Sequence, residues 1–149
     1  MSLSELHKHL TQFQDLQNLS NHPSDTSNGF EWAWHYDGGR YDYHVGASVM
    51  VHGNEVGPLS GLIAIIDALS HQIVNFGGRF TCFIGNVEAA LEQKRFLDED
   101  LNRVFTFHND PQTHEQKRAQ QLLPILDSLD LYIDFHQTIL DVQKLINIC

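Results

Sequence analysis

The residues with the clearest chemical potential form a short His-x-x-Glu pair, His52 and Glu55. Imidazole nitrogen and carboxylate oxygen are both zinc ligands, and a catalytic zinc typically has three protein ligands and one open position for water. His136 supplies a third ligand of a fitting type from a distant part of the chain. Asp134, two residues before it, is suited to orient an imidazole from behind. Together these residues predict a site for one zinc ion.

The His-x-x-Glu pair alone is weak support for zinc. In a chain with 10 histidines, a pair at this spacing often arises by chance, and a single histidine is more often a surface or core residue than a ligand. Two features favour a zinc site: Gly53 and Asn54 make the turn tight, and His136 follows a predicted strand. From the residues alone, a zinc site and ordinary structural histidines remain equal alternatives.

A second candidate group lies on the polar segment 95–105, which carries Arg95, Asn102 and Arg103. A guanidinium group binds a carboxylate in a bidentate fork and can stabilise a developing oxyanion. The alternative is that both arginines pair with acidic residues 98–100 on a solvated loop. Surface ion pairs of that kind are common and weak. Taken by themselves, these residues favour the ion-pair interpretation.

The elements that must position these side chains follow from apolar spacing and turn residues. Apolar residues at helical spacing predict a first helix, and alternating or continuous apolar runs predict strands. Asp110 and Pro111 are expected to be the cap and first turn of the last helix. The predicted elements are a helix over 3–18, a loop over 19–29, a hairpin of 30–36 with a strand beginning at 40–44, a buried strand over 45–51, a helix from 58, a strand over 79–84, a mostly irregular segment over 86–110, a helix over 112–129 and a short buried strand over 130–134.

This order of strands and helices predicts an α/β fold with a mixed, partly parallel sheet flanked by helices. In such sheets, ligands bind beyond the carboxyl ends of the strands. His52 and His136 both follow predicted strand ends. The fold prediction therefore places both candidate ligands at one edge of the sheet.

Composition excludes several classes of protein. The 149 residues carry a net charge of −10, with 42% hydrophobic and 19% charged residues, which fits a globular domain rather than a disordered chain. A nucleic-acid binder or a protein of anionic membrane surfaces would need a basic face. The apolar stretch 62–69 is too short to span a membrane. Met1–Leu10 lacks the pattern of a secretory signal, so we expect a cytoplasmic protein.

Several short segments, in this order, resemble the succinylglutamate desuccinylase/aspartoacylase family, a branch of the zinc carboxypeptidase-like hydrolases. They are Val-His-Gly-Asn-Glu-Val-Gly (51–57), Gly-Asn (85–86), Arg95 with Asp-Leu-Asn-Arg-Val-Phe (100–105), and Asp-Phe-His-Gln-Thr (134–138). The resemblance runs from about residue 45 to 138. It implies a zinc carboxypeptidase-like fold, with an N-terminal helix and loop over 1–29 and the N-terminal portion of the zinc hydrolase domain over 30–149.

The resemblance also implies roles for individual residues. His52, Glu55 and His136 match the family's three zinc ligands, and Arg95 matches the arginine that polarises the scissile carbonyl and stabilises the oxyanion. The family's reaction is hydrolysis of the amide bond of a small, anionic N-acyl amino acid. Zinc would activate water and polarise the carbonyl. Asn102 and Arg103 match the pair that grips the substrate's carboxylate.

The family's general base is a glutamate on a later strand, which the resemblance places beyond this chain. We therefore expect an incomplete, truncated fragment that is inactive by itself, with the C-terminal part of the domain absent. Two alternatives stay open: a zinc carboxypeptidase-like peptidase, and a zinc-binding module without catalysis. An exposed apolar strand edge around residues 145–148 further predicts self-association.

Overall fold

A computed structural model describes residues 1–18 and 30–137. Within these residues, four strands form one sheet in the order β1-β3-β2-β4. Strand β2 lies parallel to both β3 and β4, and β1 lies antiparallel to β3. The elements are α1 (Leu3–Asn18), β1 (Ala33–Asp37), β2 (His44–Val49), α2 (Leu59–Ser70), β3 (Arg79–Ile84), α3 (Val87–Leu91), the 3-10 turn η2 (Leu101–Arg103), α4 (His114–Asp127) and β4 (Leu131–Phe135).

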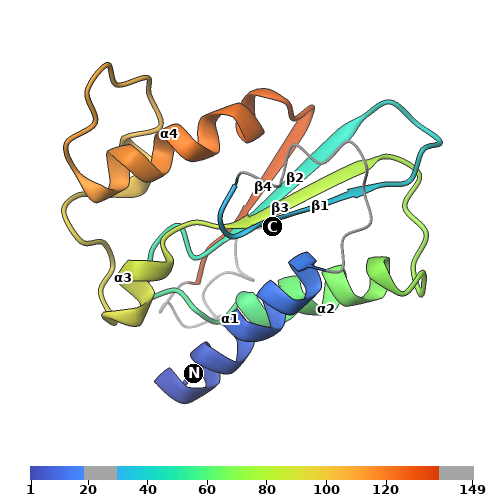
Figure 1. The fold of residues 1–149 in the computed structure, drawn as a ribbon, viewed down its shortest axis with the longest axis horizontal. Helices are drawn as coiled ribbons and strands as arrows, with labels where there is room; N and C mark the ends of the chain where they lie inside the picture. The colour runs from blue at the N-terminus through green and yellow to red at the C-terminus, as the bar shows by residue number, and fades with distance from the viewer. Residues whose placement is uncertain (19–29, 138–149) are drawn as a thin grey trace, which may run out of the picture.

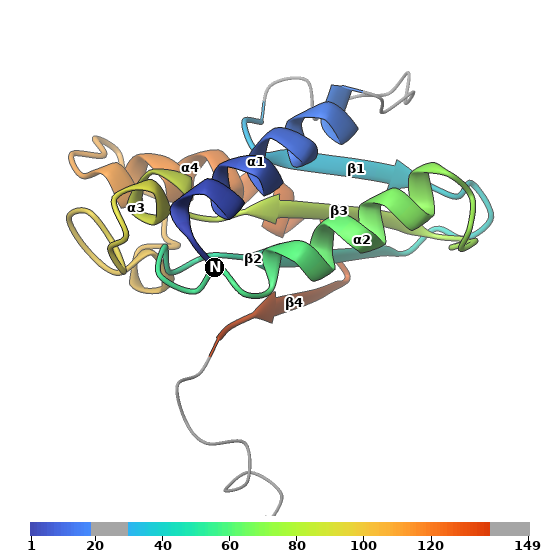
Figure 2. The ribbon, with the colours of Figure 1, turned by 90° about the horizontal axis from the view of Figure 1, so that it is seen from below.

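Helices cover both faces of this sheet, which confirms the predicted mixed α/β architecture (Figures 1 and 2). Alternate side chains of a strand point to opposite faces. Cys82 of β3 accordingly belongs to the core beneath α1 and α2, whereas Phe83 packs with Leu122 and Ile125 of α4. Four apolar residues of α1 are buried in the first of these cores, as the helical spacing predicted: Leu6, Leu10, Phe13 and Leu16.

The predicted hairpin is wrong. Strand β1 pairs with β3, which separates it from β2. The connecting residues are bonded to the chain just before β3: Gly38 N donates to Gly78 O, and Arg40 N and Tyr41 N both donate to Gly77 O. These bonds carry the chain across the end of β3 to its far side. The Asp-Gly-Gly sequence at 37–39, on which the hairpin prediction depended, therefore marks a reversal of the chain but does not determine which strand pairs with β1.

Two local predictions also need correction. Thr113, not Asp110, caps α4, because its hydroxyl accepts a hydrogen bond from Gln116 N at 3.1 Å. The segment 86–110 is more regular than predicted, since it contains α3 and η2. Asn86 caps α3 by accepting from Ala89 N at 3.2 Å. Both elements are short and begin at polar capping residues, so the sequence suggested a loop here.

Strand β4 was predicted to be buried, but it lies at the edge of the sheet in the described part of the chain. Leu131, Ile133 and Phe135 are 54%, 41% and 41% exposed. Their apolar character suggested a strand with neighbours on both sides. In the described residues, however, β4 pairs with β2 alone. The predicted loop 19–29 and the predicted apolar edge 145–148 lie outside the described residues. Among residues 1–18 and 30–137, no helix is long and apolar enough to cross a membrane.

Candidate metal centre

The turn between β2 and α2 holds the first two candidate ligands in a buried position. His52 and Glu55 are 4% and 8% exposed, and Glu55 N donates to His52 O at 3.0 Å, which closes the turn. Gly53 N donates to Arg95 O at 2.9 Å. A Cβ at Gly53 would lie 2.4 Å from Ala90 N, so this close approach of two backbones requires glycine.

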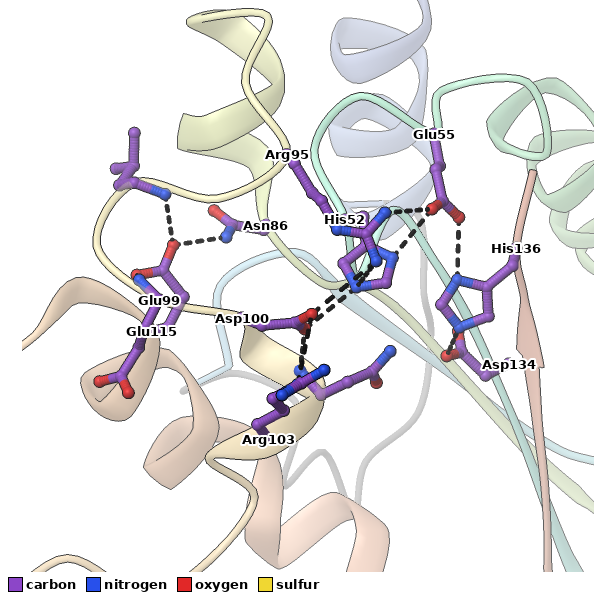
Figure 3. A network of polar contacts seen from close by, with 12 residues as sticks. His52, Glu55, Asn86, Arg95, Glu99, Asp100, Arg103, Glu115, Asp134 and His136 are labelled. Atoms are coloured by element: carbon purple, nitrogen blue, oxygen red, sulfur yellow. Dashed lines mark hydrogen bonds and ion pairs between the residues drawn. The ribbon is translucent and has the colours of Figure 1, made fainter. Parts of the chain in front are cut away.

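His136 reaches the same place from β4. Because β4 runs parallel to β2, with Phe135 opposite Val49, both chains leave the sheet at the same edge. His136 Nδ1 lies 2.8 Å from Glu55 Oε2. Ligand atoms of His52, Glu55 and His136 all lie within 4.8 Å of one another (Figure 3). The three residues predicted as metal ligands are therefore brought together by the fold.

Each imidazole of this group lies between two carboxylates. His52 Nδ1 is 2.9 Å from Glu55 Oε1, and its Nε2 is 3.0 Å from Asp100 Oδ1. His136 Nδ1 faces Glu55 Oε2, and its Nε2 is 2.5 Å from Asp134 Oδ2. Figure 3 shows the two rings converging on Glu55 with Asp100 and Asp134 on their outer sides. Asp134 occupies the orienting position that its place in the sequence suggested.

Whether a metal ion fits this group depends on which ring nitrogens carry protons. A neutral imidazole carries one N–H, so it can donate to one of its two carboxylates and presents a lone pair to the other. In the neutral tautomers that donate Nε2–H to Asp100 and Asp134, the Nδ1 lone pairs of His52 and His136 would face the oxygens of Glu55. Without a metal ion, a proton on Nδ1 takes that place and Glu55 accepts it. Acceptors facing one another at these distances need a cation between them, either a proton or a metal ion. Carboxylate–histidine–metal arrangements are built in this way, so the donor set of these residues suits a metal ion.

Arg95 adds a competing contact to His52. Its Nη2 lies 2.9 Å from His52 Nε2, and its Nη1 lies 3.2 Å from Glu55 Oε1. The Nε2 atom cannot both accept from Arg95 and donate to Asp100. A metal ion on Nδ1 would require the proton on Nε2, where Asp100 can accept it. The guanidinium of Arg95 is thus held at the edge of the ligand group mainly by the carboxylates.

The electrostatics favour charged carboxylates in the centre. Burial alone would raise the pKa of Glu55, but hydrogen bonds from Gln137 N and His136, together with His52, hold that pKa below its ordinary value. The pKa of Asp100 is likewise lowered, because hydrogen bonds from His52 and Asn102 N outweigh its burial. Burial lowers the pKa of His136, but Glu55 and Asp134 outweigh it and raise that pKa. The centre is therefore an anionic cluster arranged to hold positive charge.

The predicted substrate-binding residues lie on the outer side of Asp100. Arg103 Nε is 3.9 Å from Asp100 Oδ2, and the Arg103 side chain is 85% exposed. Asn102 is exposed, and its backbone N donates to Asp100 Oδ1 at 3.0 Å. Arg95 Nη2 is 3.8 Å from Asp100 Oδ2. The ion-pair interpretation is thus correct in part for both arginines, because each has a nitrogen within 3.9 Å of an Asp100 carboxylate oxygen.

Two polar residues near the centre were not predicted from the sequence. Ser48 donates to Asp134 Oδ1 at 2.6 Å, which fixes the carboxylate behind His136. Glu115 is fully buried on α4 and accepts four hydrogen bonds, one of them from Asn86. A serine inside an apolar strand was a usable signal for Ser48. Glu115 gave no signal, because a glutamate in the first turn of a helix is ordinary.

Comparison with known proteins defines the class of this protein. Residues 47–146 match the succinylglutamate desuccinylase/aspartoacylase catalytic domain, which is most of the chain. The protein belongs to the succinylglutamate desuccinylase/aspartoacylase family. The matched region contains every residue of the candidate metal centre.

Individual relatives carry the same family name. The chain is 33% identical over 107 residues to the succinylglutamate desuccinylase of Paraburkholderia xenovorans, a match that covers 63% of this chain and 31% of that protein. It is 34% identical over 88 residues to that of Vibrio campbellii, covering 58% of this chain and 24% of that one. The chain therefore spans about a third or less of the length of the curated relatives it matches.

Solved structures support the same fold. The succinylglutamate desuccinylase of Vibrio parahaemolyticus superposes with a TM-score of 0.58 at 25% identity, over 67% of this chain and 37% of that one. The enzyme from Chromobacterium violaceum gives 0.61 at 22% identity, over 70% and 36%. An aspartoacylase family protein from Mesorhizobium loti gives 0.60 at 22% identity, over 70% and 33%. The last two likenesses concern the fold alone.

Proposed function

We propose that this chain forms the metal-binding part of a zinc-dependent amidohydrolase that removes the acyl group from a small N-acyl amino acid, as its named relatives suggest. His52, Glu55 and His136 would hold one zinc ion. The observation that carries the proposal is the arrangement of carboxylates around the two rings: both imidazoles place Nδ1 within 2.9 Å of Glu55, and their Nε2 atoms lie within 3.0 Å of Asp100 and Asp134. When bound, zinc supplies a Lewis acid that activates water and polarises a carbonyl.

Arg95 is proposed as the residue that stabilises the developing oxyanion. Its guanidinium lies at the edge of the ligand group, in contact with Glu55 and His52, and 47% of its side chain is exposed. It can therefore meet a substrate carbonyl entering from solvent without leaving the centre. A guanidinium in such a place stabilises negative charge that appears in the transition state.

Asn102 and Arg103 are proposed to bind the substrate's carboxylate. Both are exposed and follow Asp100, whose carboxylate accepts from Asn102 N and lies near Arg103 Nε. Arg103 offers a bidentate fork to a carboxylate. Asp100 would then serve two neighbours, because it orients His52 on one side and steadies the Asn102–Arg103 turn on the other.

The test measures zinc content and turnover together, on this chain and on a longer version that carries the C-terminal part found in the relatives. Candidate substrates are N-succinylglutamate and N-acetylaspartate, with short peptides as the competing class. We expect about one zinc per chain in both proteins and turnover of an acyl amino acid in the longer one. Absence of zinc from both would contradict the proposal. Faster hydrolysis of peptides would favour the peptidase, and zinc without turnover in the longer protein would favour a non-catalytic module.

A further inference from the structure

A buried carboxylate outside the metal centre holds the segment that connects Arg95 to Asp100. Glu115, in the first turn of α4, is 0% exposed. Its Oε1 accepts from Asn86 Nδ2 and Leu97 N, both at 2.8 Å, and its Oε2 accepts from the N–H groups of residues 98 and 99 at 3.1 and 3.2 Å. A buried charge is tolerated only when hydrogen bonds replace its water. Here all four donors are neutral amides.

The held segment touches the candidate metal centre at both of its ends. At one end, Arg95 O accepts the hydrogen bond from Gly53 N, inside the ligand-bearing turn. At the other end, Asp100 Oδ1 accepts from His52 Nε2. Glu115 fixes the three backbone amides between these ends. Figure 3 shows Glu115 and Asn86 on one side of the network, with Arg95 and Asp100 between them and the ligands.

We propose that Glu115 is a positioning residue of the metal centre, which sets Asp100 and Arg95 against His52 by clamping residues 97–99. The inference rests on the proposed function, since it assigns Glu115 to the same site. Helix capping is not its task, because Thr113 caps α4 and the Glu115 side chain turns toward another segment. Burial alone would raise the pKa of Glu115, but its four hydrogen bonds hold that pKa below the ordinary value, so the acceptor stays charged at neutral pH.

The substitution Glu115→Gln tests the clamp with almost no change of shape. A glutamine presents one oxygen and one NH₂ group, and two donors face each carboxylate oxygen of Glu115. Either orientation of the amide therefore sets its NH₂ group against two N–H donors. Asn86→Asp in the same chain turns one of these donors into an acceptor. The double variant should recover part of the loss, which a general destabilisation would not do.

The experiment uses the 149-residue chain and three readouts. Amide hydrogen exchange follows residues 97–99, and the ¹⁵N shift of His52 Nε2 reports its bond to Asp100, with the buried His44 as internal reference. Zinc affinity is measured by competition with a chromophoric chelator. Leu122→Ala, which truncates a fully buried side chain of the same helix, is the control for lost stability.

We expect Glu115→Gln to speed exchange at residues 97–99 by about 10-fold or more, to move the His52 signal, and to weaken zinc binding about 3- to 10-fold, less than an outer carboxylate itself. Leu122→Ala should leave the His52 signal in place. Unchanged exchange at 97–99 would overturn the clamp, and faster exchange with an unmoved His52 signal would overturn its link to the centre. If the unsubstituted chain took up no zinc, the proposed function would fail, while exchange and the His52 signal would still decide the clamp.

Discussion

The two halves of the candidate metal centre differ in how firmly the fold holds them. His52 and Glu55 lie in a buried turn that is bonded to the 95–100 segment through Gly53. His136 follows β4, an edge strand in the described part of the chain, and 39% of its side chain is exposed. The first half is therefore held within the core, whereas the second lies at an exposed edge of the sheet. We therefore expect the metal affinity to depend more strongly on the buried half than on His136.

The largest expected effect comes from removing the ligands one at a time. His52→Ala should weaken zinc binding more than about 100-fold, beyond the effect typical of an outer residue. His136→Ala should also weaken it, but less, because the ligand on the exposed edge is the less constrained of the two. Zinc content after dialysis and chelator competition measure both. His71→Ala, at a histidine whose side chain is 58% exposed, is the control. A stronger effect at His136 would reverse the comparison, and stoichiometric zinc in His52→Ala would remove His52 from the site.

The next effect concerns the backbone of the buried half. Gly53→Ala would place a Cβ 2.4 Å from Ala90 N and 2.6 Å from Lys94 O, so the turn must move. We expect a loss of about 2–3 kcal/mol in the free energy of unfolding, together with weaker zinc binding. Gly61→Ala is the matched control, because a Cβ there would have no atom within 4 Å apart from its chain neighbours and the backbone of its own helix α2. That change should stabilise the chain by about 0.5–1 kcal/mol. Urea unfolding that gives both variants the same sign would refute the close approach at Gly53.

A smaller effect compares the carboxylates behind the two rings. Asp100→Asn and Asp134→Asn each keep an oxygen for the imidazole N–H but lose the charge that strengthens it. We expect zinc binding to weaken about 10-fold in each variant. Asp100 is held through the clamped segment and Asp134 by Ser48, so the two effects should be similar although the halves differ in exposure. Chelator competition decides this. An unchanged affinity in both variants would remove the argument from the ring protons.

Much of this centre could be predicted from the sequence, because its ligands sit at strand ends. The strand 79–84 and the helix 3–18 were predicted within the bounds observed, and His52, Glu55 and His136 do meet. Strand order could not be predicted in the same way. The Asp-Gly-Gly signal before residue 40 is local, whereas the choice of β3 as partner of β1 depends on backbone bonds to residues 77–78.

The same limit applies to polar residues that act from a distance along the chain. Glu115 meets the amides of residues 97–99 only after α4 has packed, so no spacing rule connects them. Strand β4 was misjudged for a related reason: its apolar residues record a preference for burial, but burial depends on a neighbouring strand. Ligand residues at strand ends can be predicted from a sequence, whereas residues that reach the site only through tertiary contacts cannot.

The smallest expected effect tests Glu115 through pH. Because its pKa is lowered in the folded protein, the Glu115 carboxylate contributes stability above its unfolded pKa of about 4.3, and this contribution is lost as the pH falls through the folded pKa. Glutamine at this position does not titrate. The difference in unfolding free energy between the unsubstituted chain and Glu115→Gln should therefore be largest near neutral pH and shrink below about pH 4.3.

Urea unfolding of both proteins at about pH 7, 5 and 4 measures that difference. Glu88→Gln is the control, since 68% of the Glu88 side chain is exposed and its effect should be small at every pH. A difference at Glu115 that stays constant or grows in acid would mean that the four hydrogen bonds do not depend on its charge. In that case the shape of the side chain, not its charge, would hold residues 97–99, and Asn86→Asp would not restore the stability of Glu115→Gln. A difference that shrinks places the charge of Glu115 among the forces that hold the buried half of the centre.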